Sequence, residues 1–209
     1  MRRRVRALAL AAVLVGCVPA TARADWQLTP FLGLTFKGDT TLLDHEEATG
    51  KVHWSLGGAV TLLGAGPVGV EGLVLYTPGF FQQDNPPVID GVVRPDIVES
   101  RTLALMGNVV LTTPRDWNEY GLRPFISGGI GLLYASASAT DVLDFLPVKA
   151  QLLGYNIGGG AVGSLTTRTG LRFDLRYFSN LKPTDDTENA IGRVHLSHWT
   201  GSVGVFFRF

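Results

Sequence analysis

Four charged residues stand in the middle of segments that otherwise alternate apolar and small residues. Arg172, Asp174 and Arg176 occupy every second position of one segment, and Glu71 lies within another. Alternate residues of a strand point to the same face, and buried charges are tolerated when they are paired. The spacing therefore predicts an internal salt-bridge network, which would either plug the interior or gate a narrow ion path; we favour the plug. Three further basic residues could join it: Lys37, Arg123 and Arg208.

The sequence offers weak candidates for a metal or cofactor site. Asp185-Asp186-Thr187-Glu188 could bind a divalent cation through carboxylate oxygens, but the run lacks the spacing and glycine of an EF-hand loop. We interpret it as part of a solvated acidic surface. Gly158-Gly159-Gly160 lies in a strand pattern with no helix after it, unlike a phosphate-binding turn. A single cysteine, Cys17, excludes cysteine-based zinc and iron–sulfur sites. We expect no cofactor and no metal.

Residues 1–24 have the three-part layout of a secretory signal peptide. Arg2, Arg3, Arg4 and Arg6 form a basic region, Val5 to Val18 is a mostly apolar stretch, and Ala22-Arg23-Ala24 forms an A-x-A cleavage site. We expect cleavage after Ala24, which makes residues 25–209 the mature domain. A competing interpretation uses Leu14-Val15-Gly16-Cys17, which resembles a lipoprotein lipobox with Cys17 acylated.

The signal peptide accounts for the neutrality of the whole chain. The 209 residues hold 18 Lys and Arg against 18 Asp and Glu, and residues 1–24 contain five arginines and no acid. Cleavage leaves 13 basic residues against 18 acidic ones, a net charge of −5, and removes the only thiol. Such a chain gives no reason to expect a nucleic-acid partner.

From residue 25 onward the dominant signal is an alternation of apolar and polar residues, which marks strands with two unlike faces. Short turns join the second segment to the third, the fourth to the fifth and the sixth to the seventh. The other connections, 38–51, 78–98, 136–149 and 179–195, are long and polar. This arrangement predicts an all-β fold, a single eight-stranded antiparallel up-and-down transmembrane β-barrel. The alternating residues lie in 26–36, 52–62, 68–77, 100–112, 123–134, 155–164, 171–177 and 198–209. We expect strands of about 10–14 residues, long enough to cross the apolar band of the membrane.

The alternation alone does not say which face points outward, and a soluble barrel would turn its apolar face inward. Two observations favour a membrane barrel, whose apolar face meets lipid. Charged residues occupy the polar face in mid-strand, and aromatic residues recur on the apolar face at the loop end of seven segments, as in an interfacial girdle. The predicted girdle comprises Phe36, Trp54, Tyr76, Tyr134, Tyr155, Tyr177 and Trp199. A second belt on the turn side would comprise Trp26, Trp117, Tyr120, Phe207 and Phe209.

Three stretches resemble strands of the OmpA-like outer-membrane β-barrel superfamily: RPFISGGIG at 123–131, residues 154–178, and GVFFRF at 204–209. The resemblance spans residues 25–209. It implies an eight-stranded barrel in the cell outer membrane of a Gram-negative-type cell, in contact with outer-membrane lipids. It also implies that the barrel assembly machinery recognises the alternating C-terminal residues Val203, Val205, Phe207 and Phe209. We expect the chain to lack the peptidoglycan-binding domain that some relatives carry.

The resemblance implies a fold more than a function. We expect a monomer that has a structural, adhesive or partner-binding role through its four long loops, with an unknown external partner. The alternative is a narrow pore for ions or small apolar molecules. An enzyme is the third interpretation, because lipid A deacylases are barrels of this size with a His-x-Ser-Asn motif. Here Ser179-Asn180 lacks the preceding histidine, and His195, Ser197 and His198 do not restore the motif, so we expect no catalytic residues.

Overall fold

The computed structural model describes residues 25–36, 40–41, 52–63, 66–80, 88–89, 92–93, 97–114, 121–139, 148–181, 184–186 and 191–209. The predicted signal peptide and its cleavage site at Ala24 lie outside these residues. Eight long strands form the wall: β1 (Asp25–Phe36), β3 (His53–Leu63), β4 (Val68–Pro78), β7 (Ile97–Thr112), β8 (Leu122–Ala139), β9 (Val148–Ser164), β10 (Thr169–Asn180) and β12 (Ile191–Arg208). Short strands lie in the connections: β2 (Thr40–Thr41), β5 (Val88–Ile89), β6 (Val92–Val93) and β11 (Thr184–Asp186).

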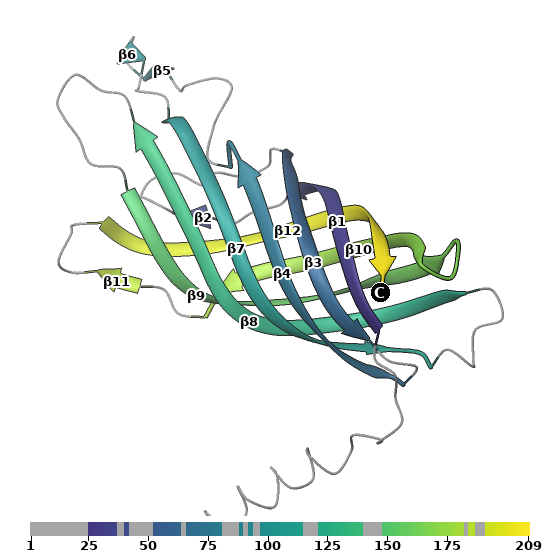
Figure 1. Cartoon of the computed structure of the whole chain (residues 1–209). Coiled ribbons are helices and arrows are strands. Elements are labelled where there is room, and N and C mark those ends of the chain that lie inside the picture. The colour runs from purple at the N-terminus through teal and green to yellow at the C-terminus, as the bar shows by residue number, and fades with distance from the viewer. Residues whose placement is uncertain are drawn as a thin grey trace, which may run out of the picture.

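The wall is a closed antiparallel barrel. Each long strand pairs with the next long strand in the chain, and β1 pairs with β12 to close the ring. The closing register runs from Gln27 opposite Arg208 to Phe36 opposite Trp199. Figure 1 shows the strands inclined to one another around this wall. Closure leaves no unpaired edge in the ring, which a membrane requires because hydrocarbon cannot hydrogen bond to the backbone. The predicted fold class is confirmed.

The strands differ from the prediction in length. The longest, β8 and β12, have 18 residues each, and β7, β8, β9 and β12 extend into stretches predicted as loops. Beyond Tyr134 the β8–β9 hairpin continues through Ser136 opposite Lys149 and Ala137 opposite Val148. Backbone pairing does not require an apolar face once the strands leave the lipid, so the alternation that defined the segments ends before the strands do.

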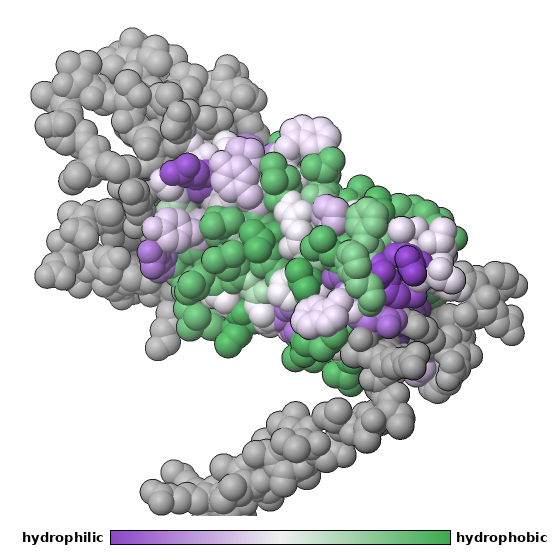
Figure 2. Space-filling model, viewed as in Figure 1, coloured by the Kyte–Doolittle hydropathy of each residue, from purple (hydrophilic) through white to green (hydrophobic). Residues whose placement is uncertain are grey.

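Outward positions of the wall are apolar and exposed. In β4 the exposed and buried residues alternate along nearly the whole strand, and the outward Trp54, Ile126 and Ile157 are 70%, 62% and 61% exposed. Figure 2 shows hydrophobic side chains over much of the middle of the visible wall, with hydrophilic ones more frequent toward both ends. Such a continuous apolar exterior fits lipid rather than water. The choice of a membrane barrel over a soluble one is therefore confirmed.

Among the residues that the structure describes, no helix has the length and hydropathy to span a membrane.

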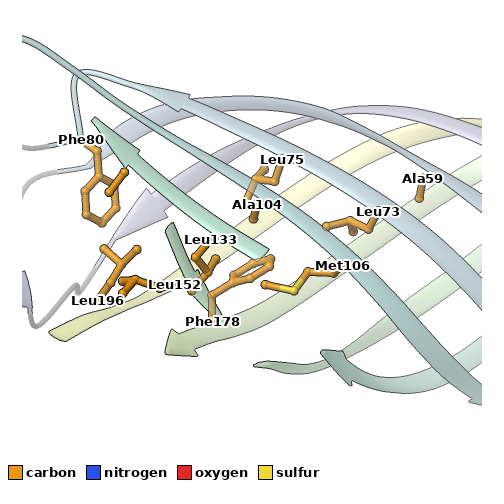
Figure 3. Close-up of a cluster of buried hydrophobic side chains, with 11 residues drawn as sticks. Ala59, Leu73, Leu75, Phe80, Ala104, Met106, Leu133, Leu152, Phe178 and Leu196 are labelled. Carbon is orange, nitrogen blue, oxygen red and sulfur yellow. The ribbon is translucent and has the colours of Figure 1, made fainter. Parts of the chain in front are cut away.

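The interior is more apolar than the sequence predicted. Eleven buried side chains form a cluster in the loop half of the lumen (Figure 3). The partly buried Phe31 packs against this cluster. A smaller cluster lies in the turn half and contains Val110, Phe125, Val162 and Phe206. Along β7 and β9, Asn108 and Asn156 of the charge network stand between members of the two clusters. The lumen is thus of mixed character: the buried Thr, Ser, Asn and charged side chains of the polar face line it together with two apolar clusters that the sequence did not predict.

Candidate functional site: the closed lumen

The four charged residues singled out in the sequence meet inside the barrel. Glu71 projects from β4, and the other three project from β10, which lies across the lumen. Arg172 donates from Nη1 to Glu71 Oε2 and from Nη2 to Asp174 Oδ2, the latter at 2.7 Å. Arg176 donates to Glu71 Oε1 at 3.0 Å and to Asp174 Oδ2 at 2.7 Å. Each arginine therefore bridges the same two carboxylates.

Neutral side chains complete this charge layer. Glu71 also accepts hydrogen bonds from Asn108 Nδ2 at 2.9 Å and Thr61 Oγ1 at 3.2 Å. Asn156 donates to Asn108 Oδ1 at 2.7 Å and accepts from Arg176 at 3.3 Å. The layer thus joins side chains of five wall strands: β3, β4, β7, β9 and β10. These strands face one another across a lumen that is only wide enough for side chains.

The charge layer is balanced and dry. The side chain of Glu71 is 0% exposed, and those of Arg172, Asp174 and Arg176 are 8%, 7% and 3% exposed. Two positive charges face two negative ones, which is the condition under which buried ions are tolerated. The guanidinium of Arg172 also lies 4.5 Å from the ring centre of Phe125, within the range of a cation–π contact.

Little open space remains beside the charge layer. A cavity of about 10 Å³, measured as the volume open to the centre of a water molecule, lies among Phe31, Leu73, Leu75, Asp174, Arg176, Phe178, Thr200 and Ser202. That is room for about one water molecule. Nearby, Thr35 Oγ1 lies 2.6 Å from Ser55 Oγ and 3.0 Å from Thr200 Oγ1. This cavity can therefore hold about one water molecule beside the charge layer.

An unexpected polar residue lies within the loop-side cluster. His198 is 2% exposed, and neither of its ring nitrogens has a hydrogen-bond partner. Its ring stacks on Phe178 at 5.0 Å and meets Phe80 edge-on at 5.1 Å. The alternation of residues in β12 places His198 on the inward face, but it does not reveal this aromatic packing. Phe178 directly follows the outward Tyr177 and therefore points inward, so the alternation could have indicated an aromatic side chain inside the barrel.

The barrel resembles several proteins of known structure, although its sequence does not match a known family. No protein-family model matches the chain, and no curated protein sequence matches it either. Neisserial surface protein A superposes with a TM-score of 0.61 at 11% identity, over 88% of this chain and 97% of that one. A major outer membrane protein from Thermus thermophilus superposes with a TM-score of 0.56 at 15% identity, over 90% of this chain and 100% of that one. For the N-terminal β-barrel domain of Pseudomonas aeruginosa OprF, the TM-score is 0.53 at 15% identity, over 90% of this chain and 100% of that one.

The chain has the OmpA-like fold of an eight-stranded outer-membrane β-barrel. The likeness covers almost the whole of each compared chain, and the apolar exterior matches it. The expected location, the cell outer membrane, is confirmed by these two observations together, and contact with membrane lipid follows from them.

The predicted girdle residues lie on the outer face of the barrel, toward its loop end. Four of them are adjacent around the wall: Tyr155 and Tyr177 have ring centres 6.4 Å apart, Tyr177 and Trp199 5.2 Å, and Trp199 pairs with Phe36 across β12 and β1. The remaining three, Trp54, Tyr76 and Tyr134, do not pair with other girdle residues. In the strand register each of them lies opposite a leucine. On the turn side, Trp26, Phe207 and Phe209 are exposed, whereas Trp117 and Tyr120 lie outside the described residues.

The C-terminal residues proposed as an assembly signal lie on one face of β12. Val203, Val205 and Phe207 are 47%, 41% and 41% exposed on the outer surface, and Phe209 is 80% exposed just beyond the strand. The inward residue between them, Phe206, is fully buried. Their recognition by the assembly machinery stays a prediction.

Two arginines expected to join the charge layer lie elsewhere. Arg123 donates to the backbone oxygens of Thr113 and Gly66 at the turn end of the barrel. Arg208 pairs with Asp25 at 3.6 Å, where the first and last strands meet. Both stand too close to strand ends to reach Glu71, which corrects that expectation. Lys37 lies outside the described residues.

Ser179 and His198, two of the residues considered for hydrolysis, are not arranged as a nucleophile and a base. Across β10 and β12, Ser179 is opposite Ser197, whereas His198 is opposite Phe178. Ser179 Oγ donates to the backbone oxygen of Asn180 at 3.4 Å, and the ring nitrogens of His198 hold no hydrogen bond. The side chain of His195 lies outside the described part. Within that part, no group of three or more His, Cys, Asp or Glu could hold a metal ion.

Proposed function

We propose that the protein is a closed outer-membrane anchor that presents its four long loops to a partner outside the cell. The observation that carries the proposal is the filled lumen, in which two apolar clusters flank a balanced layer of ion pairs. An ion crossing this interior would have to leave water and displace packed side chains, both of which cost free energy. The wall therefore serves to hold the loops at the surface, and loops are where binding residues concentrate.

The charge of the loops indicates what kind of partner suits them. The stretches 38–51, 78–98, 136–149 and 179–195 contain 12 Asp and Glu against five Lys and Arg. One compared structure, the attachment invasion locus protein Ail of Yersinia pestis, was solved in complex with the heparin analogue sucrose octasulfate, and superposes with a TM-score of 0.52 at 14% identity. A polyanion of that kind would be repelled by acidic loops. For this chain we propose a positively charged partner surface.

Conductance across a planar lipid bilayer tests whether the barrel is an anchor or a pore. We expect the folded protein to give no stepwise current. We expect the same for the Glu71→Ala variant, because the apolar clusters remain in place on both sides of the charge layer. Insertion is checked by reconstituting the same preparations into vesicles and by the altered electrophoretic mobility of unheated samples. Stepwise current from the wild type would support the pore alternative, and current from the variant alone would show that the ion pairs are a gate.

A further inference from the structure

A groove crosses the outer wall of the barrel over β3, β4 and β7. Its volume is about 480 Å³, and Gly72 and Gly107 form its floor. The outward side chains around the floor are all apolar: Trp26, Val60, Leu62, Val70 and Val109. Glu71 and Asn108 also border the groove, but their side chains point into the lumen, where they hydrogen bond to each other.

Two glycines create the depression. Gly72 and Gly107 are direct partners across the β4–β7 pair, and both point outward. A Cβ atom added at Gly72 would have no heavy atom within 4 Å, and one added at Gly107 would approach only the backbone oxygen of Ile130, at 3.9 Å. The backbone therefore tolerates a side chain at both positions, and neither glycine is needed for packing within the barrel. What the pair does supply is a recess flanked by the three valines.

The groove lies in the turn half of the wall, and the short turns of outer-membrane barrels lie on the periplasmic side. Trp26 is the second residue of β1, Leu62 the second last of β3, and Val70 the third of β4, and all three ends lie at the short turns. Trp26 stands at the level where aromatic residues meet the membrane interface. The recess thus runs from the interface toward the middle of the membrane, along the path of a lipid chain.

We propose that this groove is a binding site for one acyl chain of a phospholipid in the periplasmic leaflet. The wall around it already faces lipid, and apart from the indole N–H of Trp26 at the interface no outward side chain in the groove offers a hydrogen bond, so an apolar chain suits it. In a membrane the gain comes from close packing rather than from escape from water, and a flexible chain can follow a recess. A second copy of the barrel fits less well, since a two-fold interface would set one hollow against the other.

Photochemical crosslinking tests the site. The full mature chain is reconstituted in vesicles of phosphatidylcholine that contain a small fraction of the same lipid with a diazirine midway along one acyl chain. After irradiation, mass spectrometry of peptides locates the adducts. We expect adducts on Val60, Val70 and Val109 to exceed those on outward residues of β8 and β10, such as Ile126 and Phe173, by at least threefold. An even distribution around the wall would overturn the proposal.

A pair of variants distinguishes groove binding from general lipid contact. Gly72→Leu with Gly107→Leu fills the recess from two positions at which an added Cβ has room, and we expect the excess of adducts at the three valines to disappear. Gly163→Leu places the same side chain on the outer face of β9, two strands beyond β7, where an added Cβ meets nothing closer than 3.6 Å, and should leave the excess unchanged. Altered mobility of unheated samples checks folding. Adducts that persist in the filled variant, or crosslinks between two protein chains through these valines, would contradict the proposal.

Discussion

Glu71 is the residue on which the charge layer depends most. It accepts hydrogen bonds from both arginines, Asn108 and Thr61, so Glu71→Ala leaves two buried guanidinium groups with Asp174 as their single carboxylate. Removal of one partner from a buried ion pair costs about 3–5 kcal/mol. We expect a loss of this size in the free energy of unfolding, measured by urea titration in lipid vesicles.

A double-mutant cycle provides the control for that measurement. Arg172→Ala alone should also destabilise the barrel, whereas Glu71→Ala combined with Arg172→Ala should cost clearly less than the sum of the two single changes. Residues that share one network are coupled in this way. Additive effects, or an unchanged unfolding midpoint for Glu71→Ala, would show that the ion pairs seen here contribute little to stability.

At His198 we expect a substitution to raise the free energy of unfolding rather than lower it. Its two ring nitrogens are buried without hydrogen-bond partners between Phe178 and Phe80, and such a group costs about 1–3 kcal/mol. His198→Phe keeps an aromatic ring in this place and removes the polar atoms. We expect the free energy of unfolding to rise by about 1–2 kcal/mol in the same urea titration. His53→Phe, at a partly exposed histidine 6.1 Å from Phe80, serves as the control, with a smaller change. A loss of stability in His198→Phe would mean that the imidazole has a role that this packing does not reveal.

At the scale of a strand, the glycines of β9 allow it to lie close against β10. Gly158 faces the lumen, and a Cβ added there would come within 2.8 Å of the Cα of Arg176. Gly158→Ala should therefore displace β10 at the charge layer and destabilise the barrel by about 1–3 kcal/mol, as overpacking does. Gly72→Ala is the matched control, because its Cβ enters open space, and its unfolding midpoint should stay near that of the wild type. Equal midpoints for the two variants would contradict this account of β9.

The sequence predicts strands well where their two faces differ and poorly where both are apolar. In β1 the inward Gln27, Thr29 and Thr35 contrast with outward Trp and Leu residues, so the faces are unmistakable. In β4 the run Leu73-Val74-Leu75 hides the fact that both leucines are buried in the lumen while the valine is exposed. Inward leucines and outward valines look alike without the register, and the apolar clusters were missed for this reason.

Across the whole molecule, the alternation and the lengths of the connections were enough to predict eight strands and closure of the ring. They also placed Glu71 and the charged residues of β10 on the inner face, although 101 residues separate Glu71 from Arg172 and their strands are not neighbours in the ring. The sequence could not supply the individual contacts across the lumen, because they depend on the stagger of the strands, which is fixed only when the barrel closes.

The acidity of the loops leads to a prediction for the intact protein. The four loop stretches carry seven more acids than bases, and opposite charges at an exposed surface attract one another less as salt screens them. We expect the barrel in neutral lipid vesicles to bind a fluorescent polylysine at low ionic strength. Most of that binding should be lost as the salt concentration is raised from about 0.01 to 0.15 M. Fluorescent heparin should bind weakly at every salt concentration.

A variant in which Asp39, Asp44, Glu46 and Glu47 become Asn and Gln should bind polylysine more weakly. Arg101→Gln, which alters an exposed base near the same rim, is the control and should not weaken it. Stronger binding of heparin than of polylysine by the wild type would refute a positively charged partner while leaving the closed lumen untouched.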